Sequence, residues 1–331
     1  MTAIKHLLAI SASLFLLALS GCALTPNTLR PATFYDSQLI DSQSGQPVSL
    51  VDVVNAAMHA DVVVIGEHHG HQASHLLQAR ILQQLHNRNP NVVLTLEQFD
   101  LNSQSALNDY LAGITGETEL VKDAKAWDNY RGSYRPLIEY ALHHKLPVLA
   151  ANAPADIVRC VGRQGPDYLT RLADPQRRQL PEQPFLDTPA YRKKFIAAIS
   201  SSHGSNDPAI AQRMDNVYKA QLVRDNTMAD RILQARKQHP GHQVLHLTGT
   251  FHSEQKLGTV ALLKQRAPEL SVVVLSPVFW PEDGAKPPLL ENLNKGDFLY
   301  LIQPLPPEFR NSDRRHKAMK ERFKDRSGTD C

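Results

Sequence analysis

The sequence predicts an α/β fold with a largely parallel sheet flanked by helices, because short apolar runs of β type alternate with segments of helical periodicity. Several of these runs are continuously apolar, which is typical of parallel strands buried on both faces. With 331 residues and 42% hydrophobic composition, the chain can bury the core of one large domain. The net charge is only +3, and no basic stripe with interleaved aromatic residues occurs in the predicted domain, so nucleic acid is excluded as a partner.

Residues 1–21 are predicted to be a signal peptide. Lys5 precedes the apolar run Leu7–Leu19, which is too short to span a membrane. The run ends at Leu19–Cys22 (Leu-Ser-Gly-Cys), which resembles a bacterial lipobox. This resemblance implies that Cys22 becomes the first mature residue, carries acyl chains and anchors the protein to a membrane. Ala23 favours sorting to the outer membrane, with the domain facing the periplasm or, alternatively, the cell surface. The alternative to a lipoprotein signal is an ordinary secretory signal peptide.

We predict a tether over residues 22–44, from Pro26, Pro31 and their polar neighbours, and then one domain over residues 45–307. The apolar runs predict strands at Val62–Ile65, Val92–Leu96, Pro147–Ala150, Val244–Leu247, Val272–Leu275 and Leu299–Ile302. Helical patterns occupy Ser49–Ala60, Gln72–Arg88, Gln104–Leu111, Tyr134–His144 and Ala209–Lys237.

Residues 155–240 are predicted to be a helical insertion that caps the sheet, because the stretch before Pro208 is rich in Pro, Arg, Asp and Ser and contains no strand run. Residues 308–331 form a charged tail, which we interpret as a solvated helix, with a membrane-surface role as the alternative. Cys160 and Cys331 are too few for a disulfide framework, and Cys331 ends a polar tail. We therefore expect these two cysteines to remain unpaired.

The strongest functional signal is the polar sequence that follows four of the predicted strands. The exits of parallel strands meet at one edge of the sheet, which is where α/β proteins place their ligands. The motif Gly-x-x-His occurs twice, at Gly66–His69 and Gly249–His252, and glycine there permits a sharp turn and a close backbone approach. The sequence therefore predicts one crevice that collects Glu67, His68, His69, Glu97, Asn152 and His252.

Two further histidines, His71 and His75, follow the first motif at the start of a predicted helix. Their spacing of four residues places both on one helix face, where they could chelate a metal. The alternative is that they are solvent-facing residues of the first turn. For His68 and His69 the alternative to a pocket role is a buried histidine bonded to a neighbouring carbonyl.

At these residues the sequence resembles the ChaN-type haem-binding uptake lipoproteins of the Tiki/TraB/erythromycin-esterase superfamily. The resemblance rests on the paired Gly-x-x-His motifs, the acidic residue after the second strand and the segment Leu146–Pro154, and it covers about residues 45–305. It implies an α/β core with inserted helices and haem binding linked to iron acquisition. The Tiki-like branch of the superfamily implies metal-dependent peptide hydrolysis instead.

The resemblance also implies a tyrosine as the axial ligand of the haem iron, and a phenolate suits the ferric ion. The segment Trp127–Pro136 supplies Tyr130 and Tyr134. We favour Tyr134, because it lies just before Pro136 at a predicted helix start. Arg131 and Arg135 are close enough in sequence to meet the haem propionates. The alternative for either tyrosine is a half-buried side chain that satisfies a backbone carbonyl.

The leading hypothesis is a haem-binding lipoprotein that acts in haem or iron uptake or storage at the outer membrane, with no catalysis required. If the protein fills one axial position only, a homodimer could sandwich haem, and an outer-membrane haem receptor is a further expected partner. Two alternatives stay open. One is a metal-dependent hydrolase, a peptidase or esterase, that uses Glu67, His69, Glu97 and His252, although no His-Glu-x-x-His helix or Gly-x-Ser-x-Gly elbow occurs. The other is a lipoprotein that chelates a divalent metal through the histidine cluster.

Overall fold

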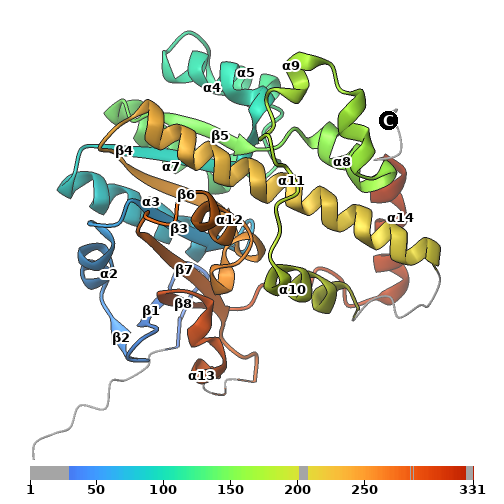
Figure 1. The fold of residues 1–331 in the computed structure, drawn as a ribbon. Helices are drawn as coiled ribbons and strands as arrows, with labels where there is room; N and C mark the ends of the chain where they lie inside the picture. Colours follow the sequence, from blue (N-terminus) through green and yellow to red (C-terminus); the bar gives the residue numbers. More distant parts are fainter. Residues whose placement is uncertain (1–29, 201–207, 284, 286, 326–330) are drawn as a thin grey trace, which may run out of the picture.

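The structure, a computed structural model, describes residues 30–200, 208–283, 285, 287–325 and 331. Its centre is an eight-stranded sheet with the order β2-β1-β8-β7-β3-β6-β4-β5 (Figure 1). The predicted α/β class is confirmed, since β3 to β8 pair in parallel and only β1 pairs antiparallel with β2 and β8. The strands are β1 (Gln38–Asp41), β2 (Pro47–Val48), β3 (Val62–Glu67), β4 (Val92–Asp100), β5 (Val148–Asn152), β6 (Gln243–Gly249), β7 (Val272–Phe279) and β8 (Phe298–Ile302).

All six predicted strands are present, and most extend past their apolar runs at the carboxyl end. The β1–β2 hairpin was not predicted, and β1 lies within the segment expected to be a tether. Asp41 closes the hairpin turn by accepting hydrogen bonds from the backbone N–H groups of Gln43 (2.8 Å) and Ser44 (2.7 Å). Gly45 has φ of 67°, a left-handed conformation that favours glycine. Strands of four and two residues are too short to produce a clear pattern.

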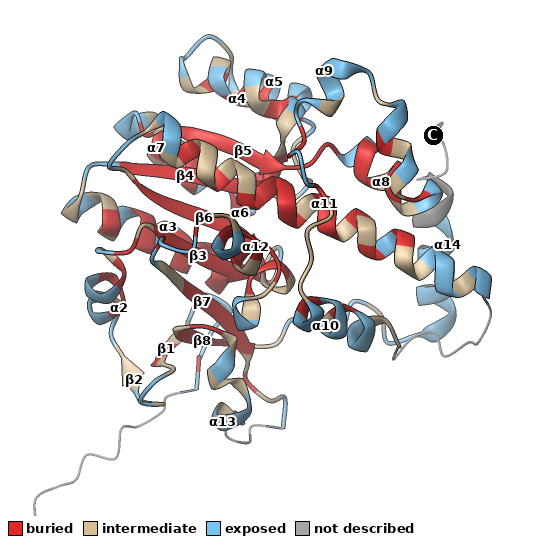
Figure 2. Cartoon of the chain, viewed as in Figure 1, coloured by how far each residue is buried: buried red, intermediate tan, exposed pale blue. Residues whose placement is uncertain are grey.

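Helices cover both faces of the sheet, and β3 shows how the sequence achieves this. Val63 and Ile65 point into a core with α2 (Leu50–Ala57), α3 (Gln72–Arg88) and α7 (Arg135–His144). Val62 and Val64 point the other way, into a core with α11 (Pro208–Gln238) and α12 (Thr259–Arg266). A strand buried on both faces must be apolar throughout, which explains the continuous run of Val and Ile in β3. Figure 2 shows the buried strands between exposed outer surfaces.

The five predicted helices are present, and α3 and α4 (Gln104–Leu111) have the predicted bounds. Ser49 begins α2 through a reciprocal pair of hydrogen bonds with Asp52, a capping box. Two short helices near the site were not predicted, α5 (Glu117–Asp123) and α6 (Tyr130–Ser133). Outside the region between β5 and α11, the other helical elements of the described residues are η1 (Leu101–Ser103), η3 (Thr250–His252), η4 (Glu254–Lys256), α13 (Leu289–Asn292), η5 (Leu293–Lys295) and α14 (Ser312–Asp325).

Between β5 and α11 the chain forms a helical region beyond the carboxyl ends of β4 and β5 (Figure 1). Its elements are α8 (Ala155–Gln164), η2 (Pro166–Arg171), α9 (Asp174–Arg177) and α10 (Pro189–Ser200). The carboxyl half of α11 packs on the sheet through Ala229 and Ile232. The amino half extends past the sheet, where Ala220 and Val223 pack against α8. This long helix therefore connects the sheet to the helical region.

The expectation of unpaired cysteines was wrong, because Cys160 and Cys331 form a disulfide. The two residues are 171 positions apart, and only the tertiary structure brings the end of the chain to α8. Gln164, also on α8, donates a hydrogen bond to the Cys331 carbonyl. Within the described ranges, we find no helix that combines the length and the apolar character needed to cross a bilayer.

Candidate functional site

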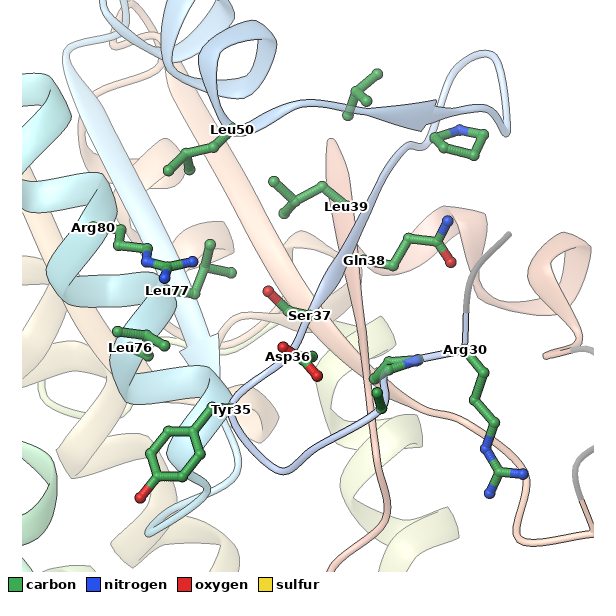
Figure 3. Close-up of a pocket in the computed structure, with 14 residues that line it drawn as sticks. Arg30, Tyr35, Asp36, Ser37, Gln38, Leu39, Leu50, Leu76, Leu77 and Arg80 are labelled. Atoms are coloured by element: carbon green, nitrogen blue, oxygen red, sulfur yellow. The ribbon is translucent and has the colours of Figure 1, made fainter. Parts of the chain in front are cut away.

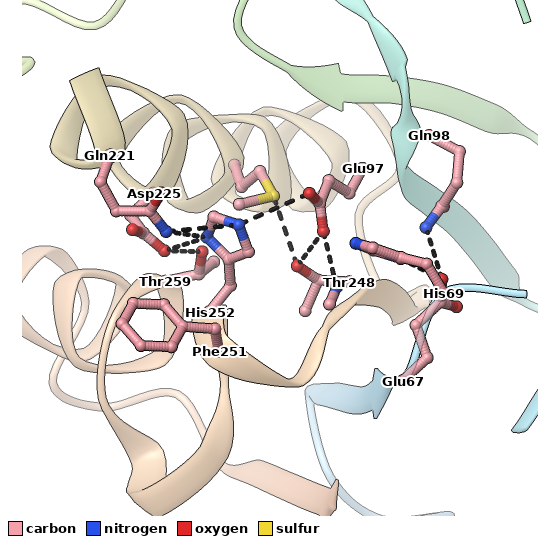
Figure 4. Close-up of polar contacts among 12 residues, drawn as sticks. Glu67, His69, Glu97, Gln98, Gln221, Asp225, Thr248, Phe251, His252 and Thr259 are labelled. Carbon is pink, nitrogen blue, oxygen red and sulfur yellow. Dashed lines mark hydrogen bonds and ion pairs between the residues drawn. The ribbon is translucent and has the colours of Figure 1, made fainter. Parts of the chain in front are cut away.

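The carboxyl ends of β3, β6 and β4 are neighbours, because β6, although later in the sequence, lies between β3 and β4 in the sheet. This arrangement brings Glu67, His69, Glu97 and His252 to one edge of the sheet, as the strand exits predicted (Figure 4). Asn152 lies at the same edge, at the end of β5 and paired with Asp100 of β4. The candidate site is therefore assembled from three central strands and the turns that follow them.

The two Gly-x-x-His turns interlock, and each glycine makes room for the other turn. A Cβ added to Gly66 would lie 2.7 Å from Ser253 Oγ and 3.1 Å from Thr250 Cα, both in the turn after β6. A Cβ added to Gly249 would lie 2.9 Å from His69 Nε2, in the turn after β3. The repeated glycine is thus required by close packing of one turn against the other.

Glu67 is a fully buried carboxylate at the centre of the first polar network, on the side of the sheet covered by α3. Its oxygens accept hydrogen bonds from His69 Nδ1 (2.7 Å), Gln78 Nε2 (2.5 Å), Gln98 Nε2 (3.2 Å) and the Tyr134 hydroxyl (2.6 Å). Burial raises the pKa of Glu67, but these hydrogen bonds and the neighbouring histidine charges outweigh it, so the pKa is lowered overall. Glu67 therefore remains ionised in the folded protein at neutral pH.

His69 is the member of this network that reaches solvent, with 43% of its side chain exposed. Its Nδ1 contacts Glu67, and its Nε2 faces the backbone of Gly249 and makes no hydrogen bond to a described residue. Trp127 packs edge-on against the ring at 4.9 Å. Burial lowers the pKa of His69, but the hydrogen bond to Glu67 and the charge of Glu97 raise it overall. One ring nitrogen is thus oriented by a carboxylate, while the other packs against Gly249 without a hydrogen bond to a described residue.

Glu97 begins a second polar network on the opposite face of the sheet, toward α11. It accepts hydrogen bonds from Thr248 Oγ1 (2.7 Å) and from the Gly249 backbone N–H (2.6 Å), and its Oε1 lies 3.5 Å from His252 Nε2. Burial raises the pKa of Glu97, but the charges of two histidines and these hydrogen bonds lower it to about 2. Glu97 is therefore a second buried, ionised carboxylate.

His252 connects Glu97 to Asp225 of α11. Its Nδ1 lies 2.8 Å from Asp225 Oδ1, which also accepts a hydrogen bond from Thr259 Oγ1 (2.9 Å), and Tyr191 donates to Asp225 Oδ2 (2.7 Å). Burial lowers the pKa of His252, but the charges of Asp225 and Glu97 raise it overall. Protonation of His252 partly offsets the charges of the two carboxylates on either side of it.

The structure corrects both interpretations of His71 and His75, since neither residue is solvent-facing and the two do not form a chelate. His71 is fully buried and caps α3: its Nδ1 accepts from the Ala73 N–H (3.2 Å) and its Nε2 donates to the Gln303 carbonyl (2.8 Å). His75 accepts from the Gly70 N–H (3.1 Å), and its Nδ1 contacts Gln78 Oε1 (3.0 Å). Both rings use both nitrogens to hold the turn after β3 in place.

His68 points toward β7 and stacks on Phe279, with the ring centroids 4.1 Å apart and an interplanar angle of 13°. Burial and then the charge of His71 lower the pKa of His68 to about 4. His68 is therefore neutral at physiological pH, and it lies beside the two polar networks rather than within them.

Both predicted haem ligands, Tyr130 and Tyr134, are buried. Tyr134 donates its hydroxyl to Glu67 (2.6 Å), and burial together with the Glu67 charge raises its pKa well above the usual value. Tyr130 has no hydrogen-bond partner for its hydroxyl among the described residues, and burial raises its pKa. A phenolate is disfavoured at both positions in this conformation, and their role as iron ligands stays a prediction.

Arg131 and Arg135, predicted to meet the propionates, are paired with a carboxylate of this chain. Arg135 Nη2 lies 3.0 Å from Glu117 Oε2 of α5, and Arg131 Nε lies 3.4 Å from the same oxygen. The prediction missed this partner because it did not foresee α5. Both guanidinium groups are thus already engaged by Glu117.

The four ligands proposed for a metal-dependent hydrolase do not converge on one point. They form separate contacts, His69 with Glu67 and His252 with Glu97. No group of three or more His, Cys, Asp or Glu side chains with metal-binding geometry occurs in the part of the chain that the structure describes. The described residues therefore do not support the predicted metal set.

Sequence analysis missed several polar residues of the two networks, namely Gln78, Gln98, Thr248 and Tyr191. Two of them carried a usable signal. Gln78 follows His71 and His75 at helical spacing, which places all three on one face of α3. Gln98 follows Glu97 at the end of β4, where the period of two turns it toward Glu67.

A cavity of about 500 Å³ lies between the N-terminal segment and α3 (Figure 3). Its lining includes Arg30, Tyr35, Leu77 and Arg80, and none of the residues of the two polar networks. It is therefore a separate feature of the molecule.

A family model matches more than half of the chain. Residues 53–263 match the family model described as "Haem-binding uptake, Tiki superfamily, ChaN". The search of curated proteins found no significant match. Among solved structures, the chain is similar to "Cofacial heme binding to ChaN of Campylobacter jejuni", with a TM-score of 0.60 and 20% identity over 81% of this chain and 98% of that one. A mutant of the erythromycin esterase EreC in its open conformation has a TM-score of 0.43 and 15% identity, over 85% and 84% of the two chains.

Proposed function

Because the chain belongs to the ChaN family of haem-binding uptake proteins in the Tiki superfamily, we propose that it binds haem and that His69 supplies the axial ligand of the iron. The observation that carries this proposal is the environment of the ring: 43% of the side chain is exposed, Nδ1 is held by Glu67, and Nε2 makes no hydrogen bond to a described residue. A Cβ at Gly249 would fill the space in front of Nε2. Haem, when bound, supplies a ferric iron that accepts a nitrogen donor.

Glu67 is the positioning residue in this proposal. Histidines that bind metals usually donate their second N–H to a carboxylate, which fixes the ring and makes the free nitrogen a stronger donor. Glu67 is in turn fixed by three further hydrogen bonds, from Gln78, Gln98 and Tyr134. Trp127 adds an apolar wall beside the ring, as a tetrapyrrole requires.

Tyr134 is the competing ligand. Its phenol would have to leave the 2.6 Å hydrogen bond to Glu67, lose a proton against a raised pKa and reach the surface from a fully buried position. His69 needs a smaller rearrangement: its own pKa is also raised, but its ring is already partly exposed and its Nε2 has no hydrogen-bond partner among the described residues. The geometry therefore favours the histidine.

The proposed cellular role is haem or iron uptake or storage at the outer membrane, with a homodimer or a haem receptor as partner. Support for the membrane anchor comes from the sequence alone, from the apolar run Leu7–Leu19 and the lipobox-like Leu19–Cys22. Mass spectrometry of the N-terminal peptide should find acyl chains on Cys22. The Cys22→Ser variant should no longer be found in the membrane fraction. An unmodified N-terminus on a protein that stays membrane-associated would contradict the anchor.

Hemin titration of the full-length protein in detergent tests the ligand. We expect a saturable Soret shift that His69→Ala abolishes and Tyr134→Phe retains, while His59→Ala, an exposed histidine at the end of α2, is the matched control. If Tyr134→Phe loses the Soret shift and His69→Ala retains it, the axial ligand of the iron is the tyrosine and not the histidine. A wild-type spectrum no different from hemin in detergent would overturn haem binding itself.

A further inference from the structure

A cavity of about 1100 Å³ between α8 and α11 is lined by four arginines. We name it the arginine pocket. No Asp or Glu is among its lining residues, which include Arg159, Arg163, Arg213 and Arg224 beside the apolar Val158 and Val217. Val217 is 40% exposed, so part of this apolar wall faces the cavity opening.

Two of the four arginines have no partner within the described residues. Arg213 and Arg224 form no hydrogen bond or ion pair there, whereas Arg159 and Arg163 make other contacts, including one of 3.9 Å from Arg163 Nη1 to Cys331 Sγ. Arg213 is exposed, whereas Arg224 is only partly exposed. A guanidinium that is partly desolvated without a carboxylate partner is at a disadvantage unless a ligand supplies the negative charge.

The arginine pocket adjoins the candidate site. α8 begins directly after Asn152 and Pro154 at the end of β5, so the pocket lies beyond the same edge of the sheet as the two polar networks. Arg224 precedes Asp225, the partner of His252, and its positive charge acts on His252. Positive charge and an apolar wall thus lie beyond the same edge of the sheet as the proposed haem ligand.

We propose that the arginine pocket binds the propionate carboxylates of the tetrapyrrole, with Arg213 and Arg224 as the principal contacts; this inference rests on the proposed haem binding. Guanidinium groups match carboxylates in shape and charge, and an amphipathic ligand needs apolar walls with a few convergent polar groups. Arg131 and Arg135, the sequence-based candidates, are already paired with Glu117. Arg213 and Arg224, which have no partner among the described residues, lie on α11 instead.

Iron-free protoporphyrin tests the pocket separately from iron ligation, because it carries the two carboxylates but no metal. We expect the full-length protein in detergent to bind protoporphyrin by fluorescence titration and to bind its dimethyl ester much more weakly. Arg213→Gln and Arg224→Gln should each weaken binding of protoporphyrin and of hemin roughly ten-fold, as expected for one charge-assisted contact. The Soret position of the hemin-saturated variants should stay that of the wild type, because His69 is untouched.

Arg178→Gln is the matched control, since Arg178 is an exposed arginine of the same helical region and pairs with the exposed Asp174. Equal binding of protoporphyrin and its ester, or full affinity in the Arg213→Gln/Arg224→Gln double variant, would overturn the arginine pocket. A wild-type protein that gives no Soret shift with hemin but binds protoporphyrin in an arginine-dependent way would refute the proposed axial ligation and leave the pocket standing. Circular dichroism and the thermal midpoint verify that each variant is folded.

Discussion

Gly249→Ala is the sharpest test of the candidate site, because it adds one methyl group directly in front of His69. Gly249 has φ of −57° and ψ of 141°, values that alanine adopts without strain. The new Cβ would lie 2.9 Å from His69 Nε2 and 3.0 Å from Cε1, whereas Glu97 Oε2, at 3.6 Å, is at an ordinary contact distance. The methyl group therefore displaces His69 and leaves Glu97 in place.

The magnitude follows from the bond that His69 must give up. Its 2.7 Å hydrogen bond to Glu67 involves a charged acceptor, a class that contributes about 1.5–3 kcal/mol. Because 43% of the His69 side chain is exposed, solvent screening reduces this to about 1–2 kcal/mol. Alanine also lowers the conformational entropy of the unfolded chain, which offsets up to about 1 kcal/mol of this loss of stability. We therefore expect a loss of about 1 kcal/mol in the free energy of unfolding and a 10–100-fold loss in haem affinity, on the order seen when a ligand's supporting contact is removed.

Two measurements decide the outcome. Hemin titration gives the affinity, and an NMR titration of the histidine ring protons should show that the raised pKa of His69 falls back toward its usual value. The control is Gly132→Ala, because an added Cβ at Gly132 meets nothing within 4 Å and alanine favours the helix there. Unchanged haem affinity together with an unchanged pKa of His69 in Gly249→Ala would refute the reasoning.

Three further predictions concern the stability of the same fold. Gly66→Ala should cost about 2–3 kcal/mol in urea denaturation, more than Gly249→Ala, because its Cβ would lie 2.7 Å from Ser253 Oγ and also meet backbone; the reverse order would contradict the interlocked turns. Burial raises the pKa of Glu97 but its partners lower it from 4.5 to about 2, so its stabilising contribution is complete above about pH 4.5 and is lost as the pH falls toward 2. Glu97→Gln should flatten the acid limb of the stability profile, and an unchanged limb would count against this. Cys331→Ser opens the disulfide to Cys160 and should lower the free energy of unfolding by roughly 2–4 kcal/mol under oxidising conditions; an unaltered urea midpoint would exclude that contribution.

The fold and the location of the site could be predicted from local patterns. Continuous apolar runs identified β3 to β8, and parallel strands necessarily present their exits at one edge, so Glu67, Glu97 and His252 could be grouped without any structure. Helical periodicity also defined the bounds of α3. These features depend on residues close in sequence and on the geometry of a parallel sheet, which is why the sequence alone determined them.

The partner of each polar side chain was decided only by the tertiary structure. His71 caps α3, Tyr134 is buried against Glu67, and Arg135 pairs with Glu117, although each had been assigned to a haem or metal site from its place in the sequence. Composition and spacing describe what a side chain can bind, whereas burial and the nearest opposite charge determine what it does bind. Those depend on contacts between distant segments, so the partner of each polar side chain became identifiable only in the folded chain.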